Sequence, residues 1–161
     1  PFLFSGTVRD NIRYGLTDAD DKAVLAAARQ ISDGDWLADL PDGLDTDVGE
    51  RGAALSVGER QLVALVRAQV ADPGLLVLDE ATSAVDPETE RALSGALVRL
   101  AEGRTTISVA HRLSTAEAAD LVAVFHHGRL EELGTHAELV ERGGRYAALH
   151  RSWVGNTRVS S

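Results

Sequence analysis

Two adjacent acidic residues, Asp79 and Glu80, directly follow an apolar run over residues 75–78. Such a run is typical of a parallel strand buried on both faces, and ligands of open α/β sheets bind at the carboxyl ends of their strands. Asp79 could hold Mg²⁺, largely through water, because this ion accepts few carboxylates and keeps waters. Glu80 could polarise an attacking water as a general base. The alternative is a strand that simply ends in a polar turn.

A second candidate site is the segment 55–61, Leu-Ser-Val-Gly-Glu-Arg-Gln. Ser56 and Glu59 form the Ser-x-x-Glu pattern of a capping box, which predicts a helix start. The pattern alone requires nothing more than a well-made cap. A helix N-terminus with a hydroxyl and a nearby Gly58 is, however, also an anion site, so Ser56 and the first backbone N–H groups could receive a phosphate.

The remaining candidates lie at predicted element ends. Asp86 precedes Pro87 and is expected to cap a helix, and His111 follows a predicted strand. The other histidines are expected to face solvent, and their spacing indicates no metal site; they are His126, His127, His136 and His150.

Composition limits the function classes. The 161 residues suit one domain, and the net charge of −9 argues against non-specific binding to nucleic acid or an anionic membrane. Cysteine is absent, which excludes disulfides and thiolate metal sites. No apolar run approaches the roughly 20 residues of a membrane helix. The chain begins at Pro1 without Met, so either an initiator was removed or the chain is a piece of a longer one.

The single lysine constrains phosphate binding. Lys22 follows Asp21, whereas a phosphate loop of the Walker A type needs a Gly-Lys pair. The chain therefore contains no such loop.

The pattern of apolar residues, caps and breakers predicts a helical first part followed by alternating strands and helices, which is half of an α/β sheet. Ser114 and Glu117 predict a further capping box, as do Thr135 and Glu138. The expected helices cover 5–13, 18–31, 35–40, 57–72, a stretch from 87, a short one after 114, 136–141 and 145–153, with a loop over 41–54 and strands at 75–78, 105–110, 121–125 and 129–133.

These segments occur in the order found in a known family. The chain resembles the ATP-binding domain of ABC transporters, of the exporter type fused to membrane helices, over almost its whole length. Segment 55–61 resembles the signature motif Leu-Ser-Gly-Gly-Gln, 75–80 resembles Walker B, 83–86 the D-loop, 109–114 the switch-histidine segment, 46–52 the exporter X-loop, and 1–12 the stretch after the Q-loop.

The resemblance implies an α/β fold with two parts. Residues 1–71 would be the helical signature-motif subdomain with the X-loop, and residues 72–154 the C-terminal half of a RecA-like P-loop NTPase core, followed by a frayed tail over 155–161. The A-loop aromatic, Walker A and the Q-loop Gln would precede Pro1. An incomplete sheet exposes an edge, so we expect the isolated chain to be marginally stable.

The resemblance also assigns roles, with ATP and Mg²⁺ as cofactors. Asp79 would hold Mg²⁺, Glu80 would be the general base, and His111 would contact the γ-phosphate and steady the attacking water. The residues expected to border the ATP held by a partner domain are Ser56, Val57, Gly58, Glu59 and Asp86.

The implied partners are a second nucleotide-binding domain, arranged head to tail in a homo- or heterodimer, and the transmembrane domains of the transporter. Glu50 and Arg51 of the X-loop would face those membrane helices. The whole would be an integral membrane exporter whose motor lies at the cytoplasmic face and couples ATP hydrolysis to export; the sequence does not define the substrate.

Two departures from the signature motif affect its activity. Val57 replaces the first Gly and limits how closely backbone and phosphate approach. Glu59 replaces Gln, so its carboxylate either repels a γ-phosphate or folds back onto the cap. We therefore hypothesise an asymmetric heterodimer with one stronger and one weaker site.

Two other functions compete with the motor of an exporter. The chain could be a non-catalytic half-domain that only docks onto a partner through Ser56 and Asp86. A soluble ABC ATPase of DNA repair shares the signature and Walker B motifs, but the exporter-like X-loop and the acidic balance disfavour it, so no nucleic-acid partner is expected.

Overall fold

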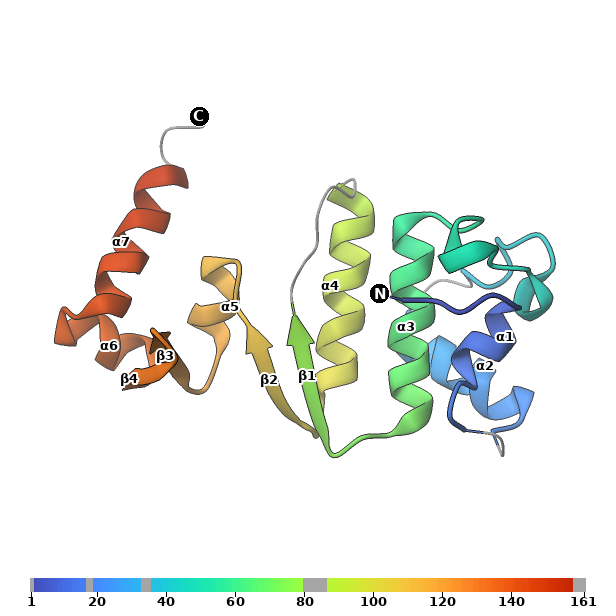
Figure 1. The fold of residues 1–161 in the computed structure, drawn as a ribbon, viewed down its shortest axis with the longest axis horizontal. Coiled ribbons are helices and arrows are strands. Elements are labelled where there is room, and N and C mark those ends of the chain that lie inside the picture. Colours follow the sequence, from blue (N-terminus) through green and yellow to red (C-terminus); the bar gives the residue numbers. More distant parts are fainter. Residues whose placement is uncertain (1, 17–18, 33–35, 80–86, 158–161) are drawn as a thin grey trace. The chain divides into compact units, whose positions relative to one another are not determined.

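The computed structural model describes residues 2–16, 19–32, 36–79 and 87–157, and Figure 1 shows their fold. The chain divides into two compact units, residues 1–77 with 82–107 and residues 78–81 with 108–161. Within the described residues, no helix is both long and apolar enough to cross a lipid bilayer. The boundary that the resemblance implies between residues 71 and 72, from helical subdomain to RecA-like core, stays a prediction.

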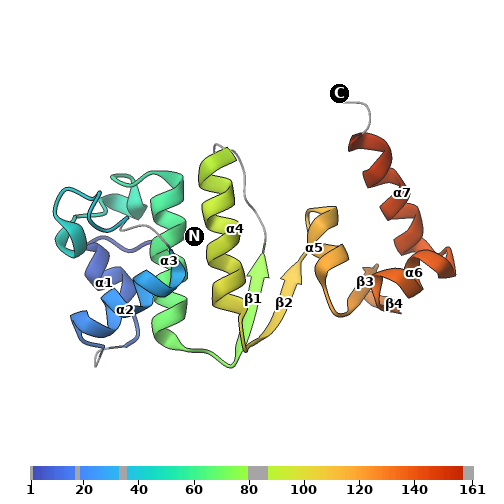
Figure 2. The same cartoon turned by 180° about the vertical axis from the view of Figure 1, so that it is seen from behind.

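The first unit is mainly helical. Its elements are α1 (Val8–Ile12), α2 (Asp21–Ile31), the short 3-10 helices η1 (Gly43–Asp45) and η2 (Glu50–Gly52), α3 (Val57–Ala71) and α4 (Pro87–Ala101). Helices α3 and α4 lie side by side in both views (Figure 1 and Figure 2). Helix α3 also contacts α1 and α2, so it is the element around which this unit packs.

Side-chain caps decide where the first helices begin. Helix α1 begins after Thr7, whose side chain forms a capping box with Asp10, rather than at Ser5 as expected. Helix α2 begins at Asp21 with Asp20 as its N-cap, rather than at the expected Asp18, which itself lies outside the described residues.

The helix expected over residues 35–40 is wrong in its described part, and the loop over 41–54 contains η1 and η2. Residues 36–40 form turns. Pro41 disfavours the α conformation in the residue before it, and burial fixes the segment instead. Trp36, Leu37 and Leu40 are all buried.

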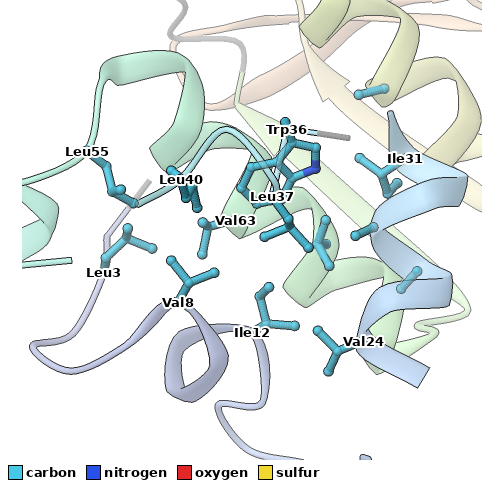
Figure 3. Close-up of a cluster of buried hydrophobic side chains, with 14 of the residues drawn as sticks. Leu3, Val8, Ile12, Val24, Ile31, Trp36, Leu37, Leu40, Leu55 and Val63 are labelled. Carbon is cyan, nitrogen blue, oxygen red and sulfur yellow. The ribbon is translucent and has the colours of Figure 1, made fainter. Parts of the chain in front are cut away.

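An apolar core holds the helices of the first unit together (Figure 3). It gathers side chains from the extended start of the chain, from α1 to α4 and from the turn segment. Its labelled members in the figure are Leu3, Val8, Ile12, Val24, Ile31, Trp36, Leu37, Leu40, Leu55 and Val63.

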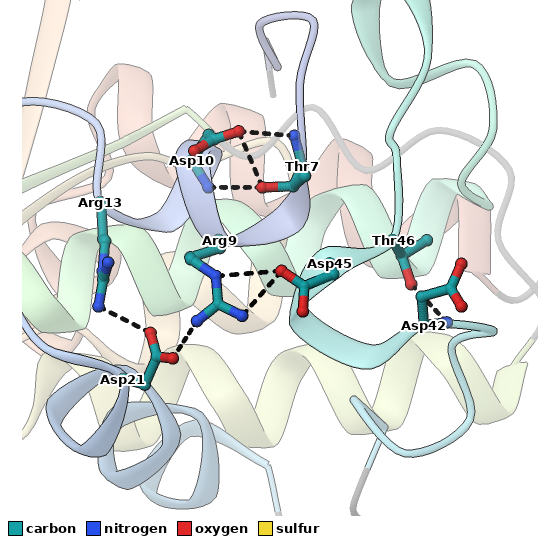
Figure 4. A network of polar contacts seen from close by, with 8 residues as sticks. All are labelled: Thr7, Arg9, Asp10, Arg13, Asp21, Asp42, Asp45 and Thr46. Atoms are coloured by element: carbon teal, nitrogen blue, oxygen red, sulfur yellow. Dashed lines mark hydrogen bonds and ion pairs between the residues drawn. The ribbon is translucent and has the colours of Figure 1, made fainter.

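A polar network on the same unit joins α1 to α2 and η1 (Figure 4). The Arg9 guanidinium pairs with Asp21 and donates to Asp45 Oδ1 at 2.8 Å, and Arg13 donates to Asp21 at 2.7 Å. The hydrogen bond from Arg9 is the main reason that the pKa of Asp21 lies below its usual range. In Figure 4, Thr46 Oγ1 also accepts from the Asp42 backbone N–H, which closes the η1 turn.

Strands β1 (Leu75–Asp79) and β2 (Thr105–Val109) form a two-stranded sheet and run in the same direction (Figure 1). These strands occur where the sequence predicts them, to within a residue. Several of their apolar side chains are in water, as expected for an incomplete sheet. The exposed fractions are 51% for Leu75, 67% for Val77, 54% for Ile107 and 50% for Val109.

The second unit contains an antiparallel hairpin and three helices. Its elements are α5 (Leu113–Ala118), β3 (Val122–His126), β4 (Arg129–Gly134), α6 (His136–Arg142) and α7 (Arg145–Thr157). The register of the hairpin shifts between Val124 and Phe125, which marks a bulge. Its small core contains Ala116, Val124, Leu139 and Tyr146.

The caps of the second unit confirm one prediction and contradict another. Thr135 and Glu138 form the expected capping box at α6. Ser114 does not cap α5, because that helix begins at Leu113 and lacks a side-chain cap bond. Glu117 lies near His150 instead of folding back. Helix α7 continues to Thr157, beyond the end expected at Trp153, and 158–161 lie outside the described residues.

Substitution of a core isoleucine tests the packing of the first unit. Ile12 is fully buried in α1, so Ile12→Ala should lower the free energy of unfolding by about 2–5 kcal/mol, through lost transfer energy and a cavity. The matched control is Ile107→Ala, which should cost about 1 kcal/mol or less because half of its surface is already in water. Urea denaturation of the purified protein measures both, and equal losses would contradict this core.

Candidate functional site

Asp79 and His111 lie together at the ends of neighbouring strands. Asp79 is the last residue of β1, and His111 follows β2. The His111 Nε2 lies 3.2 Å from Asp79 Oδ1. An ionised carboxylate only accepts hydrogen bonds, so in this pair Nε2 carries the proton and donates. The side chains are 74% and 57% exposed, respectively, and a ligand can therefore reach the pair.

The pair suits the cofactors expected from sequence. A carboxylate that is exposed to water at a strand end fits Mg²⁺, because this ion prefers oxygen ligands and keeps part of its water shell. An imidazole N–H beside it is a donor suited to a phosphate oxygen. Glu80 and Asp86 lie outside the described residues.

The segment 55–61 forms the predicted helix start. Ser56 Oγ accepts from the Glu59 backbone N–H at 3.2 Å, and Glu59 Oε2 accepts from the Ser56 backbone N–H at 2.6 Å. The Glu59 side chain thus folds back onto the cap, one of the two alternatives raised by the sequence. The Ser56 hydroxyl can still donate to an anion, but the backbone N–H of Ser56 is already occupied.

Val57 and Gly58, at the start of α3, differ in their exposure to solvent. Val57 is 38% exposed, whereas Gly58 is buried. A Cβ at Gly58 would lie 2.6 Å from Thr89 Cγ2 on α4. Close packing of α3 on α4 therefore explains a glycine here without any ligand. Ser56 and Asp79 belong to different units, so the two groups are described separately.

The X-loop segment is held to α3 by an arginine. The backbone has a positive φ at Gly49, Arg51 and Gly52. Arg60 Nη1 donates to the carbonyl oxygens of Gly52 at 3.1 Å and Leu55 at 2.6 Å. Arg60 thus fixes the loop against α3, and Glu50 and Arg51, which are predicted to face membrane helices, are exposed.

A buried polar tie behind this region was missed by the sequence analysis. Arg67 on α3 donates to the Asn11 backbone oxygen at 2.6 Å and to Asn11 Oδ1 at 2.9 Å. Asn11 Oδ1 also accepts from the Phe4 N–H at 2.9 Å. Burial lowers the pKa of Arg67. An asparagine within a short helix and an arginine beside an apolar stripe are the only sequence signals for this tie.

One expectation about the histidines is wrong. His126, His136 and His150 are half-buried rather than solvent-facing, whereas His127 is exposed as expected. His136 and His150 form a group with Glu117 whose potential ligand atoms all lie within 4.8 Å of one another. Sequence spacing did not indicate this group because the three residues come from three different helices.

Comparison with known sequences decides the family. The sequence profile described as "ABC transporter" matches residues 1–83, which is more than half of the chain. The chain belongs to the ABC transporter family. The order of signature, Walker B and switch-histidine segments agrees with this membership, as does the α/β fold with a small parallel sheet and flanking helices.

Several relatives are similar over nearly the whole chain. An ATP-dependent lipid A-core flippase of Chromobacterium violaceum is 51% identical over 148 residues, covering 92% of the chain and 25% of that protein. A mitochondrial potassium channel ATP-binding subunit of Mus musculus is 47% identical over 161 residues, covering 100% of the chain and 22% of that protein. The chain thus spans about a quarter of the length of these relatives.

A solved structure has a similar fold. A bacterial Atm1-family ABC exporter with ATP bound matches with a TM-score of 0.80 and 43% sequence identity. The match covers 99% of this chain and 27% of the exporter chain. The fold is therefore that of part of an ABC exporter's ATP-binding domain.

The Gly58 contact makes a measurable prediction. Gly58→Ala should destabilise the protein by about 1–3 kcal/mol, since the added methyl would overlap Thr89 and force α3 and α4 apart. The matched control is Gly95→Ala in α4, where the new methyl would meet only the Arg99 guanidinium at 3.6 Å. This control should stabilise the helix by about 0.5–1 kcal/mol. Chemical denaturation compares them, and a stabilising Gly58→Ala would contradict the packing.

Proposed function

We propose that this chain is part of the motor of an ABC exporter, which binds and hydrolyses ATP in the presence of Mg²⁺ and couples hydrolysis to export. The observation that carries the proposal is the contact between Asp79 and His111 at the ends of two neighbouring parallel strands. The exporter-like relatives and the matched exporter structure support it. The motor would work at the cytoplasmic face of the membrane.

The chain's own residues define the chemistry at this edge. Glu80 would accept the proton of a water that attacks the γ-phosphorus. Asp79 would hold Mg²⁺, which when bound neutralises charge on the phosphates. The N–H of His111 now donates to Asp79; with nucleotide present it would donate to a γ-phosphate oxygen instead, since both acceptors are anionic oxygens.

A second nucleotide would meet the signature helix of this chain from a partner domain arranged head to tail. Ser56 would donate its hydroxyl to the γ-phosphate, and Gly58 would allow α3 to begin close to α4. Asp86 would contact the partner across the interface. In an exporter the transmembrane domains would meet the exposed Glu50 and Arg51.

The capping box supports an unequal pair of sites. Glu59 occupies the Ser56 N–H and adds a negative charge at the start of α3. This charge stabilises the helix but opposes a phosphate at the same end. Val57 adds a partly exposed side chain at the same place. The site that this chain completes for its partner would be weaker than the site served by Glu80.

Removal of the proposed general base tests the motor function. In the full transporter, Glu80→Gln should lower ATP turnover at the site served by Glu80 by about a hundredfold or more, while ATP binding persists, because only proton transfer is lost. Glu102→Gln, an exposed carboxyl just after α4, is the matched control and should leave turnover unchanged. Undiminished turnover in Glu80→Gln would refute the general-base role of Glu80.

Hydrolysis rates at the two sites test the asymmetry. In an assembled heterodimer, the site served by Glu80 should turn over faster than the site bordered by Val57 and Glu59. Glu80→Gln blocks the site served by Glu80, and the equivalent substitution in the partner domain blocks the other site. Each variant therefore isolates the rate of the site that remains active. Glu59→Gln should speed the slower site by removing the repelling charge, and equal rates at the two sites would refute the hypothesis.

A further inference from the structure

Three metal-ligating side chains meet in the second unit, away from the Asp79–His111 pair. Glu117 comes from α5, His136 is the first residue of α6, and His150 comes from α7. One potential ligand atom from each lies within 4.8 Å of the others. The motor chemistry uses none of these residues, so the group needs an explanation of its own.

The distances are close to those of a metal centre. His150 Nε2 lies 3.4 Å from Glu117 Oε1. Ligand atoms around a tetrahedral zinc with bonds of about 2.0 Å are roughly 3.3 Å apart. The His150–Glu117 pair already has this separation. The remaining closure is at most roughly 1.5 Å, a distance that side-chain rotation covers.

The surroundings of His136 favour a preorganised ring. His136 Nδ1 lies 2.8 Å from the Tyr146 hydroxyl, and the two rings meet edge to face with centroids 5.7 Å apart. Tyr146 is buried, and burial with the nearby Glu117 charge raises its pKa, so the hydroxyl stays neutral. A hydrogen bond of this kind orients a ligating histidine and defines which nitrogen is available.

We propose that Glu117, His136 and His150 form a binding site for a divalent cation of the zinc class, with water at the fourth position. Two imidazole nitrogens and one carboxylate suit Zn²⁺ and similar transition metals. Mg²⁺ and Ca²⁺ prefer oxygen ligands throughout and are poorly served here. The site is distinct from the Mg²⁺ expected at Asp79.

A bound cation would join α5 to α6 and α7. Helix α5 begins two residues after His111, so a tie through Glu117 would restrain the segment that carries this histidine. Without metal, His150 and Glu117 make a weak polar contact of 3.4 Å between α7 and α5. Metal binding would therefore stiffen the second unit.

Zinc titration of the metal-free protein in excess Mg²⁺ tests the site. Calorimetry should show one Zn²⁺ per chain, and Zn²⁺ should raise the unfolding temperature. The double variant His136→Ala with His150→Ala should bind at least about tenfold more weakly. The matched control is the double variant His126→Ala with His127→Ala, which changes a neighbouring pair on the hairpin whose ring centroids are 3.9 Å apart. It should bind Zn²⁺ as the unchanged protein does.

Two further measurements keep the test decisive if the double variant does not fold. Co²⁺ bound to the unchanged protein should give the visible spectrum of a four-coordinate site, and Glu117→Gln, which keeps the side chain's size, should weaken Zn²⁺ binding. Absence of Zn²⁺ binding, displacement of Zn²⁺ by Mg²⁺, or loss of binding in the His126 and His127 control would overturn the proposal. None of these outcomes depends on ATP turnover.

Discussion

The burial of α3 among α1, α2 and α4 is the constraint on which the first unit depends. Val63 and Val66 are fully buried on this helix, so its position is set by packing and not by its own propensity. Everything proposed for the signature segment follows from that position. The N-terminus of α3 presents Ser56, and its first turns supply Arg60 to the X-loop.

Polar side chains of α3 form hydrogen bonds with specific partners, and these bonds fix the rotation of the helix about its own axis. Arg67 reaches the Asn11 carbonyl and side chain, and a half-buried guanidinium without such partners would be costly. The same arginine donates to the Phe2 carbonyl at 3.2 Å, so it also holds the start of the chain. A rotation of α3 by one residue would break these bonds and expose the apolar stripe.

The parallel direction of β1 and β2 explains why the candidate residues lie together at one edge of the sheet. Neighbouring parallel strands end on the same side, which brings Asp79 and the residues after Val109 together. The sheet leaves apolar side chains of both strands in water. In the second unit, α5, α6 and α7 bring together Glu117, His136 and His150, the group for which we propose a metal site.

The sequence by itself determined the local features and the family. The caps at Ser56 and Thr135, both strands of the small sheet and the hairpin follow from short-range patterns, since each depends on residues a few positions apart. The motifs that indicated the family are also short segments, so they can be identified from the sequence alone. Tertiary structure alone decided the rest: the buried turns at Trp36, the Asn11–Arg67 tie, the contact of Gly58 with Thr89, and the histidine group. Each of these joins residues far apart in the chain, and packing of whole elements, which no local pattern encodes, brings them into contact.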